Sequence, residues 1–112
     1  MAYTRPMVII ETSVFTRCIT ELLSDDDYAD LQAELVQRPA AGDLIKGGHG
    51  LRKLRWKSEG GGKRGGIRVI YYWFTADDQL GMLYAYAKAE REDLTRQQLT
   101  QLAEIVERWK DG

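Results

Sequence analysis

The stretch IRVIYYWFTADDQLGMLYAYA, residues 67–87, decides the fold of this 112-residue chain. Residues 67–75 are rich in β-branched and aromatic side chains, and both faces of the run are mostly apolar, which is typical of a central strand. Residues 76–79, ADDQ, have the composition of a tight turn, and residues 80–87 form a second strand-like run. We therefore predict an antiparallel hairpin in the middle of a sheet.

A third strand is predicted just before this hairpin. Residues 51–57, LRKLRWK, alternate in character, so Leu54 and Trp56 point to the core and the basic side chains point to the opposite face. The basic residues on that face are Lys53, Arg55 and Lys57. Residues 58–65, SEGGGKRG, form a glycine-rich connector between the two strands. Three consecutive strands with short connections predict antiparallel pairing.

The flanking segments predict one short strand and three helices. The run MVII at 7–10 has the length of a strand. Apolar residues recur at helical spacing in three stretches, 14–23, 28–36 and 99–109. The second of these helices stops before Pro39, because the residue before a proline disfavours helical geometry. Residues 40–50 form a loop. Side chains that can cap a helix precede each helical stretch, and these are Thr12 or Ser13, Ser24, and Thr95 with Gln98 as a capping box.

The predicted order is strand, helix, helix, three strands, helix, and the fold class is α+β. We expect a compact antiparallel sheet with the helices packed on one face and an open, basic, concave face opposite.

The length fits one domain spanning residues 1–112. A single cysteine, Cys18, and the lack of a membrane-length apolar run or a signal peptide predict a cytoplasmic protein that does not bind membranes.

Positive charge is concentrated in the middle of the chain. The formal net charge is −1, yet residues 46–68 contain eight basic residues and one acidic residue. Such a local field attracts polyanions. If the hairpin register places Arg68 and Tyr86 on the same face as Lys53 and Arg55, the sheet presents a cationic surface suited to RNA, because cations neutralise phosphates and aromatic rings stack on bases. The alternative is a solvated basic hairpin.

The usual catalytic motifs are missing from the sequence. His49 is the only histidine, so a pair of catalytic histidines is excluded. No His, Cys and carboxylate spacing predicts a metal site, and no phosphate-binding glycine motif occurs. We therefore predict no metal and no cofactor, and any chemistry would depend on Arg, Lys and Tyr side chains.

The segment GGHGLRKLRWKSEGGGKRGGIRVIYYW, residues 47–73, followed by LYAYAKAEREDLT, residues 83–95, resembles the RelE/ParE superfamily of bacterial toxins, most closely its HigB-type branch. The resemblance covers nearly the whole chain in length and element order. It implies a metal-independent endoribonuclease that enters the ribosomal A site and cleaves the mRNA being translated. It also implies a cognate antitoxin of helix-turn-helix type, encoded beside the toxin, that neutralises it by binding.

The resemblance also implies the site residues. The strand arginine that contacts the scissile phosphate falls on Arg68. The catalytic candidates are Arg68, Lys53, Lys88 and Tyr86. The RNA-binding candidates are Arg55, Lys57, Lys63 and Arg64. A second arginine of well-studied members is Ala89 here, and their C-terminal tyrosine has no counterpart, so Tyr86 is the substitute. Lys53 and Lys88 both stay candidates for the general base.

Two other functions compete with this one. A ParE-like toxin would inhibit gyrase without nuclease chemistry. Gyrase inhibition does not require a surface that binds phosphate, such as Arg55, Lys57 and Arg68 would form, so this cluster argues against the ParE-like function. A non-catalytic RNA- or partner-binding module would use the basic hairpin for binding alone.

Overall fold

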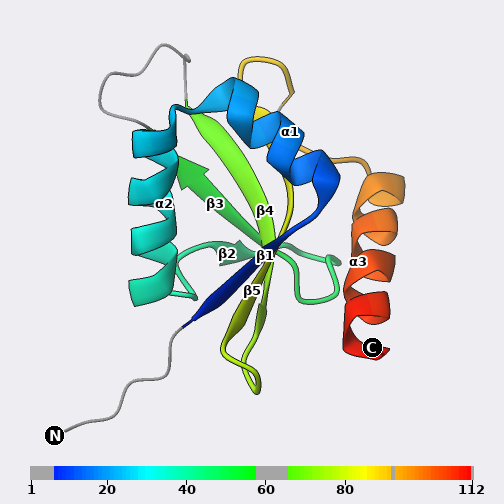
Figure 1. The fold of residues 1–112 in the computed structure, drawn as a ribbon. Coiled ribbons are helices and arrows are strands. Elements are labelled where there is room, and N and C mark those ends of the chain that lie inside the picture. The colour runs from blue at the N-terminus through cyan, green and yellow to red at the C-terminus, as the bar shows by residue number, and fades with distance from the viewer. Residues whose placement is uncertain (1–6, 58–65, 92, 112) are drawn as a thin grey trace, which may run out of the picture.

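A computed structural model describes residues 7–57, 66–91 and 93–111 of the protein. The elements, in chain order, are β1 (Val8–Glu11), α1 (Ser13–Leu22), α2 (Asp25–Gln37), β2 (Asp43–Leu44), β3 (Arg52–Trp56), β4 (Ile67–Phe74), β5 (Gln79–Ala87) and α3 (Arg96–Asp111). The strands form one sheet with the order β1-β5-β4-β3-β2 (Figure 1). The predicted α+β class is confirmed.

The central hairpin lies where the sequence places it. β4 and β5 pair antiparallel from Ile67 opposite Ala87 to Phe74 opposite Gln79, within one residue of the predicted bounds. Asp78 closes the turn with a positive φ of 52°, a conformation that aspartate tolerates better than most residues. The register shifts between Ile70 and Tyr71, where a β-bulge adds one residue to β5.

The prediction of a wholly antiparallel sheet is wrong at one edge. β1 runs parallel to β5, with Val8 opposite Gln79 and Glu11 opposite Met82. Two helices and three strands separate β1 from β5 in the chain, so no hairpin fixes the direction of β1. The predicted loop at 40–50 also contains β2, which pairs with β3 through only two residues, Asp43 and Leu44.

The helices cover both faces of the sheet, and the prediction that all three lie on one face is wrong. α1 and α2 pack on the face of Leu54, Val69 and Tyr71. α3 packs on the opposite face, over Ile70 and Phe74 (Figure 1). That face of β4 is itself apolar and needs a cover, because exposing it to water would lose the free energy of burial.

The predicted helix caps are confirmed. The Thr12 hydroxyl accepts a hydrogen bond from the Phe15 N–H at 2.9 Å, and the Ser24 hydroxyl accepts one from the Asp27 N–H at 3.1 Å. Before α3, Thr95 and Gln98 form a reciprocal capping box: each backbone N–H donates to the other side chain, at 2.8 and 3.1 Å. These bonds satisfy N–H groups that the first helical turn leaves without a partner.

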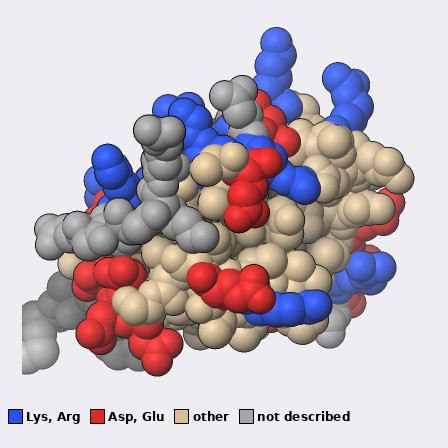
Figure 2. Space-filling view, turned by 90° about the horizontal axis from the view of Figure 1, so that it is seen from above, with Lys and Arg blue, Asp and Glu red and all other residues tan. Residues whose placement is uncertain are grey.

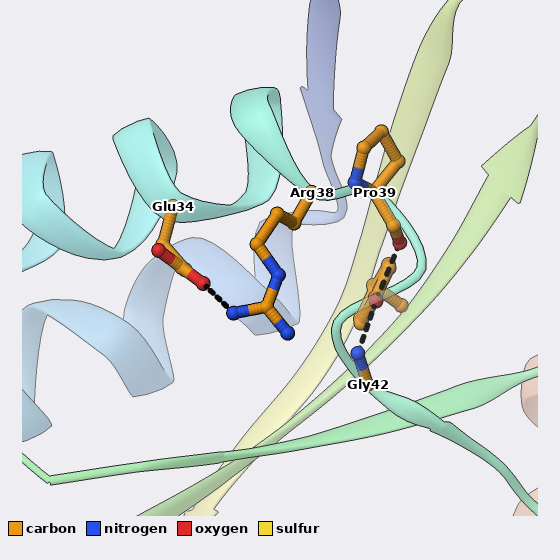
Figure 3. A network of polar contacts seen from close by, with 5 residues as sticks. Glu34, Arg38, Pro39 and Gly42 are labelled. Carbon is orange, nitrogen blue, oxygen red and sulfur yellow. Dashed lines mark hydrogen bonds and ion pairs between the residues drawn. The ribbon is translucent and has the colours of Figure 1, made fainter.

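The buried hydroxyl of Tyr71 fixes the connection between α2 and β2. It donates to the Pro39 carbonyl at 2.7 Å and accepts from the Gly42 N–H at 2.8 Å (Figure 3). Arg52 donates to the Gly42 carbonyl at 2.8 Å. A Cβ at Gly42 would lie 2.7 Å from the Tyr71 ring, so only glycine fits. The network therefore holds β2 against β3.

Replacing Tyr71 with Phe is expected to lower the free energy of unfolding by about 1–3 kcal/mol, because the Gly42 N–H and the Pro39 carbonyl lose a buried partner. Urea denaturation measures the change. Tyr84→Phe, at a half-buried ring on β5, is the matched control and should stay within about 0.5 kcal/mol of the unsubstituted protein. Equal stabilities for the two variants would contradict the role of the Tyr71 hydroxyl.

Candidate active site

A cleft of about 440 Å³ opens on the sheet face that carries α3. Its walls come from β2 and the loop after it, from β3, β4 and β5, and from α3 and the segment that leads into it. The residues that line it are Asp43, Leu44, Ile45, Lys46, Lys53, Arg55, Ile70, Tyr86, Asp93, Leu94 and Leu99. The cleft therefore gathers charged side chains from segments up to 50 residues apart in the chain.

The strand registers place three candidate residues in one row across the sheet. Arg55 lies opposite Arg68, and Arg68 lies opposite Tyr86. Side chains that are directly opposite on neighbouring strands point to the same face, with Cβ atoms about 5 Å apart. Lys53 lies opposite Ile70 and joins this face. The strand registers therefore place Lys53, Arg55, Arg68 and Tyr86 on one face of the sheet.

The face is less open than expected at two of these residues. Arg68 is 9% exposed and Tyr86 is 4% exposed. Arg68 donates from Nη1 to the Ile67 carbonyl at 3.1 Å. The predicted open face is therefore closed at Arg68 and Tyr86, and Leu94 and residues of α3 pack in the same cluster as Tyr86 on this side of the sheet. Arg68 is not among the residues that line the cleft, although its cross-strand neighbours Arg55 and Tyr86 are.

Asp93 is a cleft residue that the sequence analysis did not select. Lys53 donates from Nζ to Asp93 Oδ1 at 2.7 Å. The hydrogen bond and the charge of Lys53 lower the pKa of Asp93, and the charges of Arg55 and Arg68 add to the effect. Asp93 belongs to the quoted segment at 83–95, but nothing in its local pattern indicates a partner 40 residues earlier.

Tyr86 is held in its protonated form. Burial raises the pKa of its phenol above the ordinary value, and the negative charge of Asp93 raises it further, whereas Arg68 and Arg91 act in the opposite direction. Because a free tyrosine has a pKa of about 10, the Tyr86 hydroxyl carries its proton at neutral pH. It can therefore donate a hydrogen bond or a proton to a group in the cleft.

A family model described as the RelE toxin of the RelE / RelB toxin-antitoxin system matches residues 7–111. The chain belongs to the RelE toxin family.

Solved structures show the same fold as this RelE-family chain. The E. coli RelBE toxin-antitoxin complex contains a chain with a TM-score of 0.54 and 12% identity, and the match covers 72% of this chain and 95% of that one. An arginine-to-alanine double mutant of the E. coli toxin RelE in the free state has a TM-score of 0.52 and 15% identity, covering 79% and 90%. At these identities the likeness concerns the fold.

The structure does not bring every predicted residue of the RelE-family chain into the cleft. Lys57 follows the end of β3 and is exposed, and Lys88 is exposed in the turn after β5. Neither lines the cleft. The backbone N–H of Lys88 donates to the Gly66 carbonyl at 3.1 Å, which fixes its backbone beside the start of β4. Lys63 and Arg64 lie outside the described residues.

Both signs of charge are present on the surface of the RelE-family chain. In Figure 2, Lys and Arg side chains project along the upper border of the molecule, and Asp and Glu side chains lie among and below them.

Within residues 7–57, 66–91 and 93–111, no group of three or more His, Cys, Asp and Glu side chains could hold a metal ion. Across the same ranges, no helix has both the length and the apolar character that crossing a membrane requires.

Proposed function

We propose that this chain is the toxin of a type II toxin-antitoxin system and that it cleaves mRNA on the translating ribosome. The observation that carries the proposal is the cross-strand row of Arg55, Arg68 and Tyr86. Arg55 and Tyr86 line one cleft together with Lys53. Family membership supports the toxin role. The motif at 47–73 and 83–95 supports a HigB-type member. The single cysteine, Cys18, supports a site of action in the cytoplasm.

The proposed chemistry is attack of the RNA 2′-hydroxyl on the adjacent phosphorus, with departure of the 5′-oxygen. The reaction builds negative charge on a pentacoordinate phosphorane. Arg55 and Arg68 supply guanidinium donors that stabilise this charge, and such preorganised donors act strongly in a site that excludes water. In this way the protein's own cations take the place that a metal ion holds in other nucleases.

The proton transfers are assigned to Tyr86 and a lysine. The Tyr86 hydroxyl, which keeps its proton at neutral pH, protonates the leaving 5′-oxygen. A lysine in its neutral amine form accepts the proton of the 2′-hydroxyl and becomes an ammonium, and Lys53 and Lys88 are the two candidates. Lys53 lines the cleft but forms an ion pair with Asp93, and Lys88 does not line the cleft, so both lysines stay candidates. The products are a 2′,3′-cyclic phosphate and a 5′-hydroxyl.

A cognate antitoxin is the second proposed partner. The similar E. coli chain was solved as a toxin-antitoxin complex. We propose that an antitoxin of helix-turn-helix type, encoded next to this chain, binds and neutralises it. Coexpression with the neighbouring gene product, followed by recovery of a stable complex and restored growth, tests this partner.

The deciding experiment compares one mRNA in two states. We expect the purified protein to cleave it on programmed, translating ribosomes and to cleave the naked transcript at least about 100-fold more slowly. The reason is that the ribosome aligns the scissile phosphate, and alignment supplies a large part of the barrier reduction. Primer extension maps and quantifies the cuts.

Two results would contradict this proposal. Equal cleavage of the naked transcript would show that the ribosome contributes no alignment. No cleavage in either state, combined with inhibition of supercoiling by gyrase, would instead favour the ParE-like function; no cleavage without gyrase inhibition would favour a binding module.

A further inference from the structure

Asp93 places a carboxylate among the cations of the cleft. Its Oδ1 accepts the hydrogen bond from Lys53 Nζ at 2.7 Å. The Lys53 side chain is 23% exposed, whereas the Asp93 side chain is 71% exposed. The lysine is therefore held in the cleft wall, and the aspartate reaches it from the solvent side. Charge attraction, with little burial, holds the carboxylate in place.

The surroundings of Asp93 are those that a phosphate would meet. Lys53 and Arg55 line the same cleft as Asp93. Arg68 also acts on the Asp93 carboxylate, together with Lys53 and Arg55. A phosphodiester carries one negative charge and accepts hydrogen bonds from the same donors. The carboxylate and an RNA phosphate therefore compete for one set of cations.

We propose that Asp93 is a displaceable counter-ion that holds Lys53 in the cleft of the free protein and gives way to an RNA phosphate when substrate binds. This inference rests on the proposed function. Exposed ion pairs contribute little to stability, so the substrate displaces the carboxylate at small cost. Asp93 is thus a positioning residue for Lys53, and its negative charge weakens the binding of RNA.

Replacing Asp93 with Asn is expected to strengthen RNA binding. The amide keeps the shape of the side chain and removes the competing charge. We expect the Kd for a fluorescein-labelled single-stranded RNA, measured by anisotropy at low salt, to fall about two- to fivefold. On translating ribosomes, KM should fall similarly, while kcat should change by less than about twofold, because the pair is already broken in the complex.

Three further variants make the test specific. Asp77→Asn removes the same charge from the turn at the opposite end of the hairpin and should leave the Kd unchanged. Asp93→Glu keeps a carboxylate that can reach Lys53 and should bind RNA like the unsubstituted protein. In a Lys53→Ala background, Asp93→Asn should improve RNA binding less than it does alone. The reason is that the main cation for which the Asp93 carboxylate and the RNA phosphate compete has been removed.

The possible outcomes separate this inference from the proposed function. If the unsubstituted protein binds and cleaves mRNA on ribosomes but Asp93→Asn binds like Asp77→Asn, the counter-ion role is wrong and the proposed function stands. A fall in kcat with unchanged KM would assign Asp93 to the chemical step and also overturn the counter-ion role. Failure of the unsubstituted protein to bind either RNA or ribosomes would overturn both.

Discussion

Replacing Arg68 with Ala is expected to lower the rate of mRNA cleavage about 10²–10³-fold, the usual effect of losing one preorganised donor to a developing oxyanion. Arg68 lies between Arg55 and Tyr86 in the cross-strand row, and both of these neighbours line the cleft. Arg68→Lys should recover little of the rate, because a lysine lacks the planar, bidentate fork of a guanidinium. Single-turnover cleavage on programmed ribosomes measures the rate.

A loss of stability must be separated from this loss of rate. Because Arg68 is only 9% exposed and donates to the Ile67 carbonyl, Arg68→Ala is also expected to destabilise the fold. Tyr71→Phe is the matched control, since it destabilises the protein from the other face of β4. The two variants are compared under conditions in which the same fraction of each is folded. If Arg68→Ala then cleaves mRNA as fast as Tyr71→Phe does, Arg68 is a structural residue.

Replacing Gly66 with Ala is expected to lower the free energy of unfolding by about 2–5 kcal/mol. Gly66 has a φ of +75°, which costs an L-residue about 1–2 kcal/mol. An added Cβ would also lie 2.4 Å from the Trp56 carbonyl oxygen, and relief of such crowding costs about 1–3 kcal/mol more. Chemical denaturation measures the sum.

Gly47→Ala separates the two contributions. Gly47 has a similar φ of +69°, but a Cβ there would meet no atom within 4 Å. It should therefore show the backbone contribution alone, about 1–2 kcal/mol. Because Gly66 stands two residues before Arg68 and its carbonyl accepts from Lys88, Gly66→Ala should also reduce cleavage. Equal destabilisation at both glycines would contradict the close approach of β3 to Gly66.

The sequence by itself determined the local elements of this protein. β-branched and aromatic residues at 67–75 and the turn before β5 fixed the central hairpin to within one residue. Thr12, Ser24 and Thr95 fixed the starts of the helices, because a cap depends only on residues within one turn. The two-residue period of β3 likewise fixed that Lys53 and Arg55 share a face.

The tertiary structure alone decided how these elements combine. The parallel pairing of β1, the position of α3 on the Arg68 face and the pairing of Lys53 with Asp93 all join segments that lie far apart in the chain. Hydrophobic periodicity shows that a helix has an apolar stripe, but it does not show which face of the sheet that stripe covers. The burial of Arg68 and the ion pair between Lys53 and Asp93 depend on how the elements pack together, so they became visible only in the folded protein.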